Sequence, residues 1–194
     1  MTAETDAPEI PAPAPPGRLP IRGALYWSIQ SARLIGVGWA LWGCVYFAFY
    51  WSDRAFVVES AARYFSADIS GMALWQHAAG VAAMGVGFAL SLAAIRFGLA
   101  LLGLYLAGEV FSPLASVLLR RAALFGLAAR LLEFPTRPLS GWLFSLHLPP
   151  EKQIHFWLIR PDDLVILMLL ASLAAIASVQ KAAAEMAQDH AQIV

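Results

Sequence analysis

The residues whose types could do chemistry are few and lie mostly in the second half of the chain. His147, Glu151 and His155 follow one another at intervals of four, which on one continuous helix would place two imidazoles and a carboxylate on one face for metal binding. Pro149 and Pro150 lie between the first two and disfavour such a helix. The sequence therefore predicts no metal or other cofactor.

Arg130 and Glu133 form a second candidate, because they lie at i and i+3 in a largely apolar stretch. On a helix this spacing places both side chains on one face, where they could form an ion pair. A charged pair inside a membrane is costly and marks a functional site by default. The alternative is that both lie near the end of a span and extend to the membrane surface. Both interpretations remain open at this stage.

Other catalytic patterns are missing from the sequence. His77 is the only histidine expected within a span, and a haem held by two histidines needs a second one at the same depth. There is no glycine-rich phosphate loop, nucleophile elbow or zinc-protease pattern. The single cysteine, Cys44, excludes an intrachain disulfide and is expected at a contact between helices. We therefore expect a protein that is not an enzyme.

Composition predicts an integral membrane protein. Of the 194 residues, 60% are hydrophobic and 13% charged, and the mean hydropathy is +0.65. A soluble domain has about 45–50% apolar and 25% charged residues. The 13 basic and 13 acidic residues give zero net charge, which removes the positive field needed for direct nucleic-acid binding.

Residues 1–20 are predicted to be a disordered, proline-rich cytoplasmic tail, and residues 21–194 a single membrane domain. The basic and aromatic segment 21–33 is expected at the membrane interface. The fold class expected is an all-α integral membrane protein with four transmembrane helices, at about residues 34–52, 73–97, 116–134 and 164–181. Pro135 and Pro138 are predicted to end the third span.

Two further features concern packing between these helices and the outer loops. Small residues recur along one face of the second and the last span and predict close helix contacts. They are Ala79, Ala83, Gly87 and Ser91 in the second span, and Ala171, Ala175 and Ser178 in the last. The β-branched and aromatic run 153–160 predicts a short extracytoplasmic β element, which could pair with the polar segment 53–68.

The distribution of basic residues predicts cytoplasmic termini in a bacterial inner membrane. Seven basic residues fall in the N-terminal part, the middle loop and the C-terminus, against five in the other two loops. The first set is Arg18, Arg22, Arg33, Arg96, Arg120, Arg121 and Lys181, and the second is Arg54, Arg63, Arg137, Lys152 and Arg160.

The middle loop is predicted to be a tight connection between two helices. Gly108 can adopt the left-handed conformation that ends a helix, and Glu109 must face water. Phe111 can return to the membrane interface, and Ser112 can cap the next helix before Pro113. The alternative is that Glu109 and the basic pair that follows it dock a partner.

The loop and the C-terminal part resemble a known family. The stretch from Leu104 to Ser112 (LYLAGEVFS), with Arg120, Arg121 and Gly126, is similar to the loop of small four-helix bacterial membrane proteins known as domain of unknown function family 2975. Asp162-Asp163-Leu164, an apolar helix, Gln180-Lys181-Ala182-Ala183, Glu185 and Val194 resemble that family's last span and tail. The resemblance covers about residues 33–194. The tail here carries Gln188, Asp189, His190 and Gln192 where the family is more acidic, and the family's third span usually lacks a charge such as Arg130.

The resemblance implies an inner-membrane protein without an assigned activity whose partners include small helix-turn-helix regulators. We therefore expect a non-enzymatic regulatory or interaction partner, bound to the lipid bilayer and to another membrane protein or such a regulator, and able to form oligomers. A small transporter or channel subunit is the alternative, and a membrane redox or lipid-modifying enzyme is less favoured. The candidate interaction residues are Gly108, Glu109, Phe111, Arg120, Arg121, Arg130 and Glu133.

Overall fold

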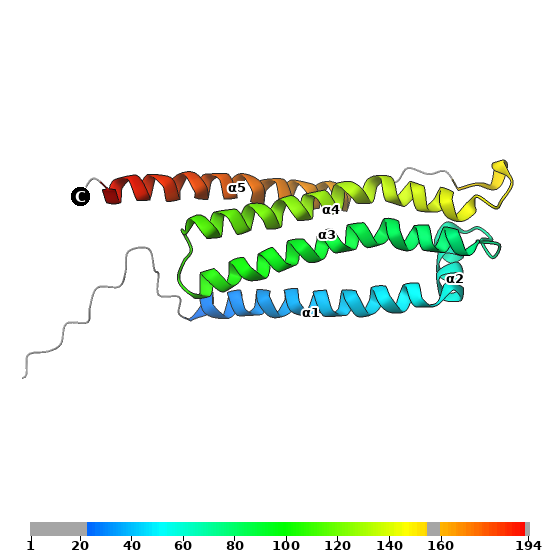
Figure 1. The fold of residues 1–194 in the computed structure, drawn as a ribbon, viewed down its shortest axis with the longest axis horizontal. Helices are drawn as coiled ribbons and strands as arrows, with labels where there is room; N and C mark the ends of the chain where they lie inside the picture. Colours follow the sequence, from blue (N-terminus) through cyan, green and yellow to red (C-terminus); the bar gives the residue numbers. More distant parts are fainter. Residues whose placement is uncertain (1–22, 155–159, 193–194) are drawn as a thin grey trace, which may run out of the picture.

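The computed structural model describes residues 23–154 and 160–192, and these residues are helical without any strand. The elements are α1 (Ala24–Ser52), α2 (Arg54–Phe65), α3 (Leu74–Leu106), α4 (Pro113–Ser145), a short 3-10 turn (Pro150–Lys152) and α5 (Pro161–Gln192). The four long helices alternate in direction, and α2 lies across one end of the bundle (Figure 1). The expected all-α fold is confirmed.

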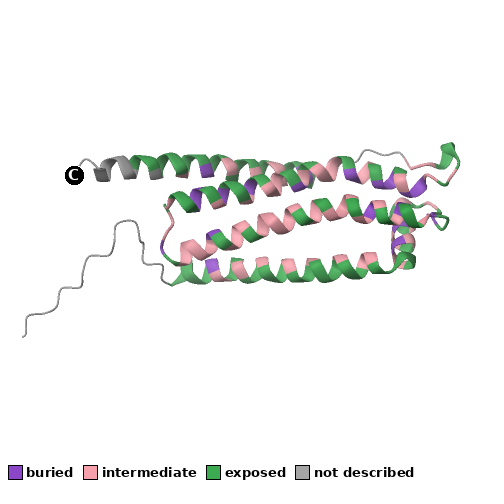
Figure 2. Cartoon of the chain, viewed as in Figure 1, coloured by how far each residue is buried: buried purple, intermediate pink, exposed green. Residues whose placement is uncertain are grey.

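The long helices pack in the order α1, α3, α4, α5. α4 lies between α3 and α5 and carries the most buried residues, whereas α1 is exposed along nearly its whole length (Figure 2). Many large apolar side chains of α1 and α5 remain uncovered, among them Trp42 and Val179, each 70% exposed. Such outward apolar surfaces suit contact with lipid.

Three helices are long and apolar enough to cross a membrane: α1, α3 and residues Pro161–Ala183 of α5, with 29, 33 and 23 residues. At 1.5 Å per residue each exceeds the roughly 30 Å of a hydrocarbon core. By length and composition, these helices suggest a membrane protein. α4 is as long as α3, with 33 residues, but it carries the charged residues described below and does not meet the same criterion of apolarity.

α1 begins at Ala24, so most of the segment 21–33 is part of the first long helix, and its position at the membrane interface stays a prediction. One predicted helix end is wrong. α4 continues through Pro135 and Pro138 to Ser145, beyond the predicted end at residue 134. Each proline removes one backbone donor, but contacts with α3 and α5 hold both sides of the prolines in one helix. The Thr136 hydroxyl also donates to the carbonyls of Leu132 and Glu133 in this region.

The segment after α1 is a helix and not a strand. Asp53 caps α2 by accepting hydrogen bonds from the backbone of Ala55 at 2.8 Å and Phe56 at 3.3 Å. Val57 and Ala61 of α2 are buried in a cluster with Phe144 of α4. The predicted pairing of this segment with a β element is therefore wrong. Residues 155–159 of that β element lie outside the described residues, and Gln153 and Ile154 form no strand.

The predicted packing of small residues is also wrong in part. Ala171, Ala175 and Ser178 are exposed, because α5 contacts α4 with a different face that includes the buried Ala177. Cys44 is exposed too and does not lie at a contact between helices.

Candidate functional site

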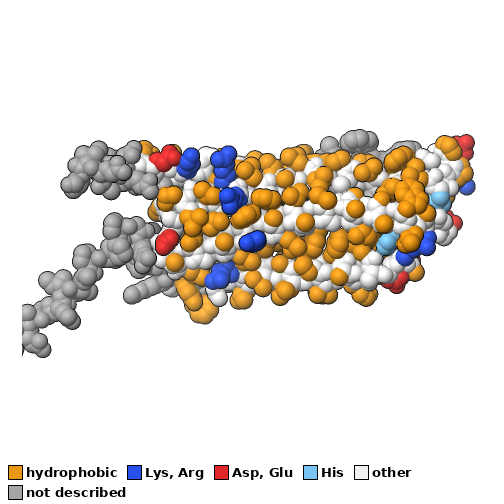
Figure 3. Space-filling model, in the orientation of Figure 1, with side chains coloured by type: hydrophobic (Ala, Val, Ile, Leu, Met, Phe, Trp, Pro, Cys, Tyr) orange, Lys and Arg blue, Asp and Glu red, His pale blue; other side chains and the backbone are white. Residues whose placement is uncertain are grey.

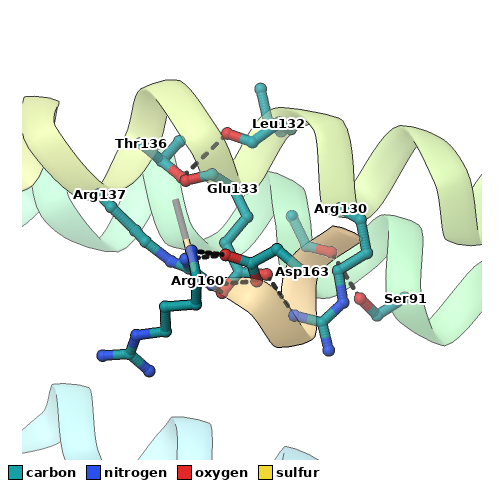
Figure 4. Close-up of polar contacts among 9 residues, drawn as sticks. Ser91, Arg130, Leu132, Glu133, Thr136, Arg137, Arg160 and Asp163 are labelled. Carbon is teal, nitrogen blue, oxygen red and sulfur yellow. Dashed lines mark hydrogen bonds and ion pairs between the residues drawn. The ribbon is translucent and has the colours of Figure 1, made fainter. Parts of the chain in front are cut away.

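Three charged residues of α4 form a network on one face. Arg130 donates from Nη1 to Oε2 of Glu133 at 2.6 Å, and Arg137 donates from Nη2 to Oε1 of the same carboxylate at 2.6 Å. Their spacings of three and four residues place them on successive turns of the same face. The pair predicted from the sequence is thus present, and Glu133 bridges two guanidinium groups (Figure 4).

The network continues to the start of α5. Arg137 donates from Nη1 to Oδ2 of Asp163 at 2.6 Å and from Nη2 to Oδ1 at 2.9 Å, a bidentate contact. Asp163 also accepts a hydrogen bond at 3.0 Å from the backbone of Arg160, the residue before α5. Its side chain is 6% exposed, and that of Arg137 is 15% exposed. One carboxylate therefore caps α5 and binds α5 to α4.

A third contact brings α2 to the same place. The Arg160 guanidinium donates from Nη2 to the hydroxyl of Tyr64 on α2 at 3.0 Å. The first residues of α5 are thus bonded both to the bundle interior and to the helix across its end.

The network borders a cavity of about 810 Å³ between α1, α3 and α4. One side consists of aromatic residues of α1, and the other of Arg130, Glu133, Thr136 and Arg137 of α4. α2 contributes Ser60, Ala61, Tyr64 and Phe65. The cavity exists because α1 packs on α3 and has no comparable contact with α4 or α5.

Small residues of α3 form the third wall of the cavity. Ala83, Gly87 and Ser91 line it, and a Cβ atom placed on Gly87 would meet no heavy atom of another turn or helix within 4 Å. The row predicted to allow close packing thus leaves space at these positions instead. Close approach occurs elsewhere, at Gly80, where a Cβ atom would lie 2.7 Å from Phe144.

The middle loop has the predicted local conformation. Gly108 has a φ of 80° and donates to the Tyr105 carbonyl at 3.0 Å, while Glu109 donates to the Leu104 carbonyl at 3.0 Å. These are the two hydrogen bonds of a Schellman motif. The Ser112 hydroxyl accepts from the backbone of Ala115 at 3.1 Å, so the expected N-cap is confirmed.

The candidate residues fall into two groups. Gly108 is buried, Glu109 is half-buried and not fully exposed as expected, and Phe111 is 57% exposed. Arg120 and Arg121 are exposed one turn or more into α4, and the Arg121 guanidinium lies 5.6 Å from the ring centre of Phe97.

Arg130 and Glu133 form the other group, and they lie near the middle of α4. Arg130 is nine positions after Arg121, which is about 13 Å along a helix. The structure therefore does not bring the loop residues and the ion pair into one site.

Arg137 and Asp163 are functional candidates that the sequence analysis missed. Arg137 follows Glu133 by four residues, which is a signal for an ion pair on a helix, but the prolines suggested that the helix had ended. Asp163 also caps α5, because it accepts the hydrogen bond from the backbone of Arg160.

The histidines do not form a metal site in the described part of the chain. His147 follows the end of α4, and His155 lies outside the described residues. No three His, Cys, Asp or Glu side chains in the described ranges are placed to hold a metal ion. His77 contacts the Trp51 carbonyl through Nε2 at 3.1 Å.

Comparison with models of known protein families, with curated proteins and with solved structures finds no match to this chain. The resemblance described above stays a prediction.

Proposed function

We propose that the protein is a non-enzymatic, four-span membrane protein that acts as a regulatory or interaction partner through one end of its bundle. The observation that supports this most directly is the location of the α3–α4 loop, the basic residues and the C-terminal part of α5 at the same end (Figure 1). This end carries Arg120 and Arg121, which are exposed and available to a partner.

The fourth span in this proposal is α4. It is packed between α3 and α5, which both meet the criteria for membrane spans, so it shares their depth. Its central charges, Arg130, Glu133 and Arg137, are paired with one another and with Asp163 of α5, which reduces the cost of placing them in a membrane. Counting the charged residues of α4 one by one therefore overestimates the cost of placing this helix in a membrane.

The proposed orientation places this end in the bacterial cytoplasm. Arg33, Arg96, Arg120, Arg121 and Lys181 lie in the parts of the four long helices nearest this end. Figure 3 shows Lys and Arg side chains gathered in a band there. Basic residues flanking spans favour the cytoplasmic side.

Cysteine labelling tests span number and orientation together. Because Cys44 is the single cysteine, Cys44→Ser gives a cysteine-free background into which Glu109→Cys or Lys152→Cys is introduced. With a membrane-impermeant maleimide on intact spheroplasts, we expect labelling of K152C alone, and of E109C only after permeabilisation. Labelling of both from outside would contradict α4 as a span.

The interaction role needs its own experiment. A photo-crosslinking amino acid at Arg120 should give a defined crosslinked partner in native membranes, whereas one at Lys152, at the opposite end, should not. If the same crosslinked products formed from both positions, a partner surface at the loop end would be contradicted.

A small transporter is the second candidate, and the cavity with charged residues is the observation that favours it. Purified protein in liposomes would then give substrate flux above that of empty liposomes. Absence of conductance and uptake would remove this candidate.

A further inference from the structure

The cavity between α1, α3 and α4 has aromatic side chains on one wall and Arg130 on another, and Arg130 has N–H donors that form no hydrogen bond within the described residues. The four charged residues of the ion network, Arg130, Glu133, Arg137 and Asp163, have no net charge. We propose that it binds an uncharged, membrane-soluble carbonyl compound of the isoprenoid quinone class, with Arg130 donating a hydrogen bond to a carbonyl oxygen. This proposal concerns the middle of the bundle and does not depend on the partner surface at the loop end.

The size of the cavity suits a ligand of this kind. At about 810 Å³ it falls in the upper part of the roughly 300–1,000 Å³ range of small-molecule sites. That volume accommodates a substituted ring and the first part of an apolar chain.

Aromatic side chains of α1 and α3 line one wall, so a planar ligand ring in the cavity would contact aromatic side chains. Phe47 of α1 and Phe88 of α3 are stacked, with ring centres 4.8 Å apart and planes 3° from parallel. Trp39 and Trp51 extend this wall along α1. Planar rings stack favourably on such surfaces with an offset.

Arg130 offers hydrogen-bond donors that the helices do not use up. The hydroxyls of Ser91, Thr136 and Ser140 donate to carbonyls of their own helices. Arg130 donates from Nη1 to Glu133, and its other N–H groups make no hydrogen bond within the described residues. A guanidinium has five N–H donors, so Arg130 can bind a carbonyl oxygen while keeping its ion pair.

The charge of the network favours an uncharged ligand over an anion. Arg130 and Arg137 are balanced by Glu133 and Asp163. A phosphate or carboxylate head would bring an unbalanced charge next to the Glu133 carboxylate in a poorly solvated site. A carbonyl oxygen accepts a hydrogen bond without adding charge.

The bundle leaves a route into the cavity from the side. α1 and α5 are the two outer helices, and α1 packs mainly on α3. Trp39 and Tyr46 line the cavity and are 50% and 53% exposed, so the cavity is not sealed. With α1 and α5 in the bilayer, this opening faces lipid, where quinones dissolve.

A titration tests the proposal. The full-length protein is placed in phosphatidylcholine nanodiscs, and decylubiquinone is added while tryptophan fluorescence is recorded, because Trp39 and Trp51 line the cavity. We expect saturable quenching. Gly87→Leu, which fills the cavity, and Arg130→Gln, which leaves Glu133 paired with Arg137, should each weaken binding by about tenfold or more.

Two matched variants serve as controls. Gly98→Leu adds the same side chain to α3 at a glycine with open space outside the cavity, and Arg96→Gln removes a charge outside it. Both should bind with wild-type affinity. Melting temperatures of all variants show whether a loss of binding reflects unfolding, and Arg130→Gln tests the site if Gly87→Leu does not fold.

Four results would overturn the proposal. Wild-type affinity in folded Gly87→Leu means that the quinone binds elsewhere, and wild-type affinity in Arg130→Gln removes the assigned hydrogen bond. Competition by an alkane as strong as that by the quinone shows that the cavity takes any apolar chain. Stronger competition by phosphatidylglycerol shows an anionic lipid site.

Discussion

Arg137 of α4 and Asp163 of α5 are joined by two parallel hydrogen bonds of 2.6 and 2.9 Å, although they lie 26 positions apart in the sequence. This contact holds the first turn of α5 against α4. It lies about 12 Å before the end of α4, since eight residues remain between Arg137 and Ser145. Removing Arg137 would leave the Asp163 carboxylate without a charged partner, and removing Asp163 would leave Arg130 and Arg137 to share the single negative charge of Glu133.

Asp163→Asn should therefore lower the free energy of unfolding by about 3 kcal/mol, because breaking a buried ion pair leaves an uncompensated charge. The neighbouring Asp162 is exposed, and Asp162→Asn should change the free energy of unfolding by less than about 0.5 kcal/mol. Denaturant titration of both variants in detergent micelles measures the difference. Equal stability of the two would show that the bidentate contact contributes little.

Pro138→Ala should leave the helical content unchanged, because α4 already continues through this position. If proline instead ended the helix, alanine would extend it and the far-UV circular dichroism signal would increase. Leu139→Ala, at the adjacent exposed position, is the control, because it introduces alanine without removing a proline. An increase found only in Pro138→Ala would contradict the continuous helix.

Gly80→Ala should destabilise the protein by about 1–3 kcal/mol, because the added Cβ would lie 2.7 Å from Phe144 and 3.1 Å from Trp51. Gly103→Ala on the same helix meets open space and should be neutral or slightly stabilising. Thermal unfolding of both variants tests the close approach of α1, α3 and α4 at this point. A neutral Gly80→Ala would mean that these helices are further apart.

Gln76→Leu should cost about 2 kcal/mol. Gln76 is 1% exposed, accepts a hydrogen bond from the backbone of Ala73 and donates one to the carbonyl of Leu143, both at 2.6 Å. Leucine would leave these two backbone groups without a partner. Gln153→Leu is the control, because Gln153 is half-buried and makes one longer hydrogen bond of 3.3 Å. A smaller loss in Gln76→Leu than in Gln153→Leu would contradict this role.

Local chemistry made the α3–α4 connection predictable. Gly108, Ser112 and Pro113 each act through the backbone of their immediate neighbours, so their roles can be read without knowledge of the rest of the fold. The Arg130–Glu133 pair was predictable for the same reason, since both residues lie on one helix.

The sequence failed where a local rule competed with tertiary contacts. Pro135 and Pro138 predict the end of a helix in isolation, but packing on α3 and α5 keeps α4 continuous. The polar segment after α1 has both helical and extended interpretations, and burial of Val57 and Ala61 against Phe144 favours the helix.

By itself, the sequence determined an apolar, charge-balanced chain of long helices, because composition and the intervals between charges depend on no distant contact. Only the tertiary structure decided that Arg137 pairs with Asp163. It also decided that Gly87 of α3 borders open space and not a neighbouring helix. The cavity forms because α1 packs on α3 and makes little contact with α4. This arrangement depends on residues far apart in the chain, so no local sequence pattern encodes it.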